Sequence, residues 1–421
     1  MTRLQHAGAL LFVCALAVIA YLPAQSLPFI ADDYVQTQLG RDYGPLAAWP
    51  ALMKDPLYRC RATSIPVTHW TEMLFGLEPL AYNLSSLLLH TANAVILYCF
   101  GLWPSIGWKR SLGMAAFFAV AEGHQEAVVW YAAIPELFVF FFSALSFLAF
   151  VMSVNGSKVR VRGYGASLAC FILALASKES GVAVVAALAI ACCVNRVPLR
   201  RAVALLSPYA LIAAAYVFGI FWSSSEILHF HDGAFSLRAP VYMTVLTSAA
   251  RMLWFWGAVA ITMLAVYNRS AVRALVPTAL CWMLIALVPY GFLSYMNRVP
   301  SRHTYLASAG LSLIVGAAFV TAVESRKKWL PVVAAFVVIV HNCGYLWTRK
   351  QAQYEQRARP TEELVQVYRR RPSKAAIQCF PYSMWIARYA IEIGAGAKWD
   401  ERMWQVRPDC GREEVRVTVE N

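Results

Sequence analysis

Long apolar segments separated by short polar turns run through most of this chain. A helix needs about 20 apolar residues to cross a bilayer. Some of the segments reach that length and others are shorter. We count eleven expected crossings, at about 7–24, 82–103, 111–122, 135–153, 163–177, 181–195, 202–222, 244–267, 274–292, 305–323 and 329–347. The sequence therefore predicts an all-α polytopic membrane protein.

The composition supports this class and excludes another. Of the 421 residues, 59% are hydrophobic and 14% are charged, whereas about a quarter of the residues of soluble domains are charged. A net charge of +14 would suggest nucleic acid as the partner of a soluble protein. Here the basic residues follow the membrane topology instead, so no nucleic-acid partner is expected.

The loop charges set the orientation. With the N-terminus in the cytoplasm, the cytoplasmic segments hold fourteen Lys and Arg residues and one acid, Glu324, as the positive-inside rule requires. The acidic residues gather on the opposite side. This separation needs an odd number of crossings, so the first loop (25–81) and the C-terminal tail (348–421) are expected outside, which in a bacterial cell is the periplasm. We divide the chain into a membrane domain, 1–347, and the small tail.

The cysteines give little functional information. Ten cysteines are scattered, mostly within apolar spans, and no C-x-x-C motif occurs. Most are expected to be small buried side chains. Cys379 and Cys410 fall in the tail, where either a disulfide or two free thiols would be compatible with an extracytoplasmic location.

Two polar turns on the predicted outer side follow unusually short apolar segments. They are Glu122–Glu126 and Ser177–Ser180. A segment of about 15 residues reaches only about 22 Å across a core of about 30 Å, so both turns are expected to lie below the membrane surface. Polar backbone at that depth is tolerated only beneath protein or beside a wet cavity. The pair Asp32-Asp33, directly after the first crossing, shares this side and this depth.

Several local patterns resemble the GT-C superfamily of polytopic glycosyltransferases, in particular its protein O-mannosyltransferase-like and transmembrane-tetratricopeptide members. Asp32-Asp33 is similar to the acidic motif of the first loop in that superfamily. Tyr58-Arg59-Cys60-Arg61 stands where relatives have a Tyr-Arg-Pro stretch, with Cys60 in place of proline. The other matching pieces are Leu74–His90, Glu122–Trp130, Ser177-Lys178-Glu179 and Arg302–Leu306. No tetratricopeptide array follows.

The resemblance implies a GT-C-like bundle and an inverting transfer of a sugar from a polyprenyl-phosphate donor to a hydroxyl of a periplasmic glycan, lipid or protein. It also implies the inner membrane of a bacterium. Inversion needs a general base, and two adjacent carboxylates raise each other's pKa. We assign Asp33 as the base and Asp32 as its neighbour, and keep the choice between them open.

The remaining roles follow from charge. A phosphate leaving group needs cations, for which Arg59, Arg61, Lys178 and Arg302 are the candidates. His124, Glu126, Glu179 and His303 are assigned to orienting the acceptor. No cofactor is assigned, although His124 and Glu126 could also complete a divalent metal site with the two aspartates.

Plainer interpretations stand beside these assignments. Arg59 and Arg61 could anchor lipid headgroups, Lys178 and Glu179 could form an ion pair that closes a hairpin, and His90 and Asn93 are expected to make packing hydrogen bonds. His229, His231 and Asp232 give only a weak metal pattern.

Two other functional classes are open. A flippase or transporter of lipid-linked glycans predicts inverted repeats and charges near the bilayer midplane. An O-antigen ligase or polymerase predicts a large late loop rich in Arg and His. The sequence shows no such repeat, and the loop 293–304 is short, so a glycosyltransferase is the favoured class.

Overall fold

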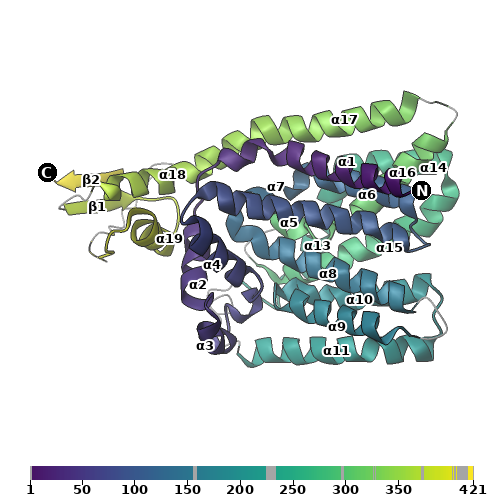
Figure 1. Cartoon of the computed structure of the whole chain (residues 1–421), viewed down its shortest axis with the longest axis horizontal. Coiled ribbons are helices and arrows are strands. Elements are labelled where there is room, and N and C mark those ends of the chain that lie inside the picture. Colours follow the sequence, from purple (N-terminus) through teal and green to yellow (C-terminus); the bar gives the residue numbers. More distant parts are fainter. Residues whose placement is uncertain are drawn as a thin grey trace.

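The computed structural model describes residues 2–154, 159–223, 234–294, 298–325, 327, 329–370, 374–400, 402, 404 and 416–420. Most of these residues form a bundle of roughly parallel helices (Figure 1). Its members are α1 (Arg3–Tyr21), α5 (Pro79–Cys99), α6 (Trp108–Val120), α8 (Ile134–Val154), α9 (Val161–Leu175), α10 (Ala183–Val194), α11 (Leu199–Trp222), α13 (Val241–Met252), α14 (Ala258–Tyr267), α15 (Arg269–Leu287), α16 (Ser308–Glu324) and α17 (Trp329–Tyr345).

The bundle confirms the predicted class. Seven helical stretches among the described residues are long and apolar enough to cross a membrane, and three shorter apolar helices accompany them. Every predicted apolar segment coincides with a helix. The number that cross, and their direction, remain predictions.

Small residues allow two of these helices to pack at close range. Gly113 of α6 faces Gly316 of α16, and a β-carbon at Gly316 would lie 2.6 Å from both the carbonyl oxygen of Arg110 and the amide nitrogen of Met114. Neither backbone atom can move without disturbing α6. Close helix contact through small residues is a common way to associate helices inside a bilayer.

The first loop and the tail gather at one end of the bundle, here called the loop end, and the N-terminus lies at the other (Figure 1). The first loop forms α2 (Asp33–Tyr43), α3 (Trp49–Lys54) and α4 (Ser64–Phe75). The stretches 46–53 and 67–75, which lie between prolines of the loop, predict short helices at the membrane surface. They correspond to α3, with the short turn before it, and to α4. Helix α2 was not predicted.

The tail is a continuation of the bundle rather than a separate piece. α17 runs through η12 (Leu346–Lys350) into α18 (Gln351–Arg369) without a break, so one helical stretch of 41 residues crosses the predicted boundary at residue 347. After α18 come β1 (Lys374–Cys379), α19 (Met384–Tyr389) and β2 (Arg416–Glu420).

The tail also supplies the exceptions to an all-α chain, because β1 and β2 pair antiparallel. Cys379 is disulfide-bonded, whereas Cys410 lies outside the described residues. The sequence pattern of His229, His231 and Asp232 lies outside them as well.

Candidate active site

Asp33 is enclosed at the start of α2, with 2% of its surface exposed. Its two carboxylate oxygens accept hydrogen bonds from the backbone N–H groups of Ile30 and Ala132, each at 2.7 Å. Burial raises the pKa of Asp33 to about 8, against these two donors, which lower it. The side chain therefore ties the first loop to the turn before α8, and neither oxygen is free for a substrate.

Asp32 differs from its neighbour although it is adjacent in sequence. It is the N-cap residue of α2, yet its carboxylate makes no capping hydrogen bond, and it has no hydrogen-bond or ion-pair partner in the part of the chain that the structure describes. Burial raises the pKa of Asp32, and the guanidinium groups of Arg302 and Arg357 lower it in part. Asp32 is half-buried, so this carboxylate combines access with a raised pKa.

Glu126 lies in the short helix α7 (Gln125–Val129) and connects it to the segment before α16. Its Oε1 accepts a hydrogen bond from Arg302 Nη1 at 2.8 Å, and its Oε2 accepts from Ser301 Oγ at 3.0 Å and from the Arg302 amide at 3.2 Å. Burial alone would raise the pKa of Glu126, but Arg302 and these hydrogen bonds lower it. Glu126 is thus an ionised carboxylate that fixes Arg302 in place.

Trp130 contacts the two guanidinium groups whose charges act on Asp32. Arg302 lies 5.0 Å and Arg357 lies 4.7 Å from the centre of a Trp130 ring, which is the geometry of cation–π attraction. The Trp130 indole N–H in turn donates to the carbonyl oxygen of Ile30 at 3.1 Å. The first loop, the turn before α8 and α18 are therefore connected through this one indole.

A second cluster is buried beside the first. Lys178 Nζ donates to Glu136 Oε1, His303 Nδ1 lies 2.5 Å from the same oxygen, and Tyr290 donates to Glu136 Oε2 at 2.7 Å. Only 12% of the Lys178 side chain and 1% of the Glu136 side chain are exposed. Burial and Lys178 lower the pKa of His303 to about 4, against the effect of Glu136, so this imidazole is neutral near pH 7.

A third contact connects the first loop to the turn after α9. Arg61 Nη1 lies 3.2 Å from Glu179 Oε2, and Cys60 Sγ donates to Glu179 Oε1 at 3.0 Å. Arg59 instead donates to the carbonyl oxygen of Gly219 at 2.9 Å, near the end of α11. Lys178 and Glu179 therefore pair with residues far away in sequence, and not with each other.

The three clusters form one row at the loop end, because adjacent residues belong to neighbouring clusters. Arg302 binds Glu126, its charge acts on Asp32, and the next residue, His303, binds Glu136. Lys178 binds Glu136, and the next residue, Glu179, binds Arg61. Most of the predicted site residues are thus brought together, with Arg59 at the margin and His124 apart from them.

His124 is placed elsewhere. It is 1% exposed; its Nδ1 lies 3.0 Å from the Phe118 carbonyl oxygen and its Nε2 lies 2.7 Å from Ser308 Oγ. Both ring nitrogens have internal partners, so the assignment of His124 to an acceptor finds no support in its placement. His90 and Asn93 make the expected packing hydrogen bonds, both to the Tyr305 hydroxyl.

The proposed metal ligands do not fit a metal. Among the residues that the structure describes, no three His, Cys, Asp or Glu side chains are grouped so as to hold an ion. Asp33 is occupied by two backbone amides, and His124 faces Ser308. We therefore derive no step through a metal.

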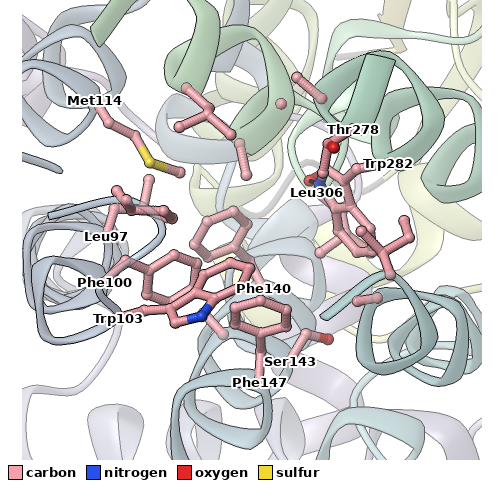
Figure 2. Close-up of a pocket in the computed structure, with 18 of the residues that line it drawn as sticks. Leu97, Phe100, Trp103, Met114, Phe140, Ser143, Phe147, Thr278, Trp282 and Leu306 are labelled. Carbon is pink, nitrogen blue, oxygen red and sulfur yellow. Dashed lines mark hydrogen bonds between the residues drawn. The ribbon is translucent and has the colours of Figure 1, made fainter. Parts of the chain in front are cut away.

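An apolar cavity lies inside the bundle, beyond the buried cluster (Figure 2). Its volume is about 100 Å³, which is below the ~300–1,000 Å³ of typical small-molecule sites. The elements that hold the cluster also line it: Phe140 lies one turn along α8 from Glu136, and Leu306 follows His303 by three residues. Other lining residues include Trp103, Phe147 and Trp282, which Figure 2 shows around the same space.

Three site residues were not among the predicted ones. Arg357 comes from α18, a helix to which the sequence pattern gave no role. Glu136 was recognised only as one of several acids on the outer side. Trp130 belongs to a matched piece of the GT-C resemblance but carries no charge. The one available signal was for Glu136, which interrupts the start of a long apolar segment, a costly position for an unpaired acid.

Comparisons with known proteins agree on the fold. No family model matches the chain, and no curated protein matches it by sequence. The structure is similar to that of ArnT from Cupriavidus metallidurans bound to undecaprenyl phosphate, with a TM-score of 0.55, 12% identity and coverage of 96% of this chain and 86% of that one.

Two structures of an oligosaccharyltransferase from Archaeoglobus fulgidus are also similar. For the one tethered to an acceptor peptide, the TM-score is 0.54 at 12% identity, and the match covers 94% of this chain and 63% of that one. For the complex with zinc and sulfate, the TM-score is 0.52 at 11% identity, and the match covers 92% of this chain and 61% of that one. The bundle thus has a GT-C-like fold, while the O-mannosyltransferase-like branch stays a prediction.

Proposed function

We propose that the chain is an inverting glycosyltransferase that moves a sugar from a polyprenyl-phosphate donor to a hydroxyl group. The observation that carries this proposal is the half-buried carboxylate of Asp32, which has no internal partner among the described residues and is acted on by the charges of two arginines held on Trp130. The GT-C-like fold supports it, as do the bound undecaprenyl phosphate of ArnT and the acceptor peptide of the archaeal enzyme. The loop end would face the periplasm of a bacterial inner membrane.

In this mechanism Asp32 is the general base. Its carboxylate takes the proton of the acceptor hydroxyl while the hydroxyl oxygen bonds to the anomeric carbon, and the bond from that carbon to the phosphate oxygen breaks. The phosphate leaves on the polyprenyl chain with the bonding electrons. Asp33 positions the loop through its two backbone hydrogen bonds. This assignment reverses the preference for Asp33 expressed from the sequence.

The leaving phosphate would bind next to Lys178 and Arg61. Three cations, Lys178, Arg61 and Arg59, stand against two nearby acids, Glu136 and Glu179. Because His303 is neutral, the net charge of this group is positive. The charge of Arg61 acts on Lys178, so an anion between them is stabilised. Arg302 is fixed by Glu126 on the side of the base. Negative charge that develops on the phosphate oxygen would thus meet preorganised cations.

The polyprenyl chain would enter the apolar cavity beyond Lys178. We expect Ala144→Phe, which narrows that cavity, to raise KM about tenfold for a long-chain polyprenyl donor, since each lost methylene contact is worth about 0.8 kcal/mol. A donor with a short prenyl chain should be affected much less. The measurement is steady-state transfer with both donors, with Ala214→Phe, at an exposed position of α11, as the control. Equal KM changes for the two donors would reject this position of the chain.

Arg357 should control the pH dependence of transfer. As the base, Asp32 must be ionised, so activity falls when the pH drops below the pKa of Asp32. Arg357 lowers that pKa, and Arg357→Gln is therefore expected to move the acid limb of the profile of kcat/KM to higher pH. Arg359→Gln, an exposed position on the same helix, should leave the limb in place. A limb that moves to lower pH in Arg357→Gln would contradict the role of Asp32.

The direct test of the function is a transfer assay with purified protein and a panel of polyprenyl-phosphate sugars. Glycan, lipid and protein acceptors are offered separately. The anomeric configuration of the product should be inverted relative to the donor. Failure with every donor, in a preparation that is folded, would reject the function.

A further inference from the structure

Arg251 is a cation without a partner inside a membrane-spanning helix. It lies in the apolar stretch Val241–Tyr267, about 15 Å along the helix from Val241 at 1.5 Å per residue. Its side chain is exposed, next to Trp254, which is 80% exposed. No hydrogen bond or ion pair to Arg251 occurs in the described ranges. An arginine in this environment is costly, which makes it a candidate for a functional site.

A second arginine lies against the same helix. The amide of Val299 donates to Ser248 Oγ at 3.1 Å, so the segment that begins with Arg298 packs on α13. Ser248 is three residues before Arg251 and therefore on the same helix face. Arg298 is exposed, and its charge acts on Arg251. The hydrogen bond of Val299 therefore brings two exposed like charges close enough to act on each other.

The acids around this pair are already engaged. Glu126 is the acid whose charge acts on Arg251, and it is bound to Arg302 and Ser301. Glu122 pairs with His341 at 3.6 Å, and Lys350 lies in range of both glutamates. Positive charge therefore exceeds negative charge here, and an anion from outside the chain would relieve the repulsion.

This arginine pair lies on a different face from the apolar cavity. Met252 and Trp256, next to Arg251 in the chain, pack with Phe117, Met283 and Leu311. Met283 belongs to α15 and Leu311 to α16. These two helices also line the cavity, through Ala279 and Trp282 of α15 and Gly310 and Leu313 of α16. α15 and α16 therefore stand between Arg251 and the cavity.

From this arrangement we propose that Arg251 and Arg298 bind the phosphate group of a second membrane lipid, distinct from the polyprenyl donor. The ligand is a lipid because Arg251 is exposed within an apolar span, where an anion carried by a bilayer lipid is more accessible than a soluble anion. A phosphate suits the pair because guanidinium groups bind its oxygens in a forked geometry.

The position of the pair gives this lipid a role, which rests on the proposed function. Glu126, in electrostatic range of Arg251, binds Arg302, and the charge of Arg302 acts on Asp32. A lipid held at Arg251 and Arg298 would thus present its headgroup towards the base from the side opposite the donor chain. The acceptor class is then a phosphate-bearing glycolipid, in preference to a protein or a soluble glycan.

The test measures binding, without turnover. The full-length chain in a neutral detergent is titrated with phosphatidic acid, and bound lipid is counted by native mass spectrometry. Arg251→Gln/Arg298→Gln should weaken binding at least about tenfold, the loss expected when charged hydrogen bonds are removed. Arg251→Lys/Arg298→Lys should retain most of the binding. Arg238→Gln, an exposed arginine in the loop before α13, is the matched control and should bind like the wild type.

Each other outcome has a defined meaning. Unchanged binding in the Gln double variant, with an unchanged unfolding temperature, would overturn the site, as would equal losses in Arg238→Gln. Displacement of phosphatidic acid by inorganic phosphate at similar concentration would overturn the lipid as its source. Displacement by polyprenyl phosphate would assign the arginines to the donor. Intact phosphatidic acid binding by a wild type that transfers no sugar would reject the proposed function and leave this site standing.

Discussion

Asp32→Asn is expected to lower kcat for sugar transfer by about 10²–10⁴-fold, the usual contribution of a general base, with no loss of folded protein. The reason is that the Asp32 carboxylate has no structural partner in the described residues, so the amide removes the basic oxygen and no internal contact. The measurement is single-turnover transfer at saturating donor. Asp42→Asn, at an exposed position of α2, serves as the control.

Asp33→Asn should behave in the opposite way. Its amide oxygen can accept one of the two backbone N–H groups, and its NH₂ group would face the other. An unsatisfied buried group of this kind costs about 1–3 kcal/mol, so we expect a lower unfolding temperature and a moderate loss of activity. If Asp33→Asn abolished transfer at full stability, and Asp32→Asn were active, the base would be Asp33.

Glu136→Ala is expected to destabilise the protein by about 3–5 kcal/mol, as is typical when one partner of a buried ion pair is removed. The variant leaves Lys178 buried without its acid and removes the partner of His303 and Tyr290. Unfolding of purified protein in detergent, followed by near-ultraviolet circular dichroism, measures the change.

A double-mutant cycle separates the ion pair from simple packing. Glu136→Leu/Lys178→Met removes both charges and should be more stable than either single variant, because no unpaired charge remains. Glu324→Ala breaks the exposed pair with Lys109 at 3.6 Å and should change stability by no more than about 1 kcal/mol. Additive losses in the cycle would show that Lys178 and Glu136 are not coupled.

The large-scale organisation was predictable because membrane insertion depends on patterns within single segments. Hydropathy identified every helix of the bundle, and segment length indicated that the turns at 122–126 and 177–180 are recessed. The structure shows those turns buried, with Ser177, Ser180 and Glu126 enclosed. These features need only local length and polarity, so one sequence is enough to find them.

The pairings within the site were not predictable, because they depend on contacts between distant segments. Asp32 and Asp33 are adjacent carboxylates in the sequence, and one of the two hydrogen bonds that hold Asp33 comes from Ala132, about a hundred positions away. Lys178 and Glu179 looked like an ion pair, yet each binds a residue more than forty positions away. Arg357 reaches Trp130 from a helix whose own pattern shows nothing but amphipathicity.

Because the helix from Trp329 to Arg369 is unbroken, the position of Arg357 relative to the site depends on the thickness of the bilayer. The first part of this helix is apolar enough to cross a membrane, and the guanidinium that acts on Asp32 lies about 40 Å further along, at 1.5 Å per residue. A thicker or thinner bilayer would push or tilt this rod and shift the guanidinium relative to a loop held by other helices. The acyl-chain length of the lipids in reconstituted vesicles should therefore shift the pH of the acid limb of kcat/KM. Bilayer thickness would then influence the ionisation of Asp32 through the position of Arg357.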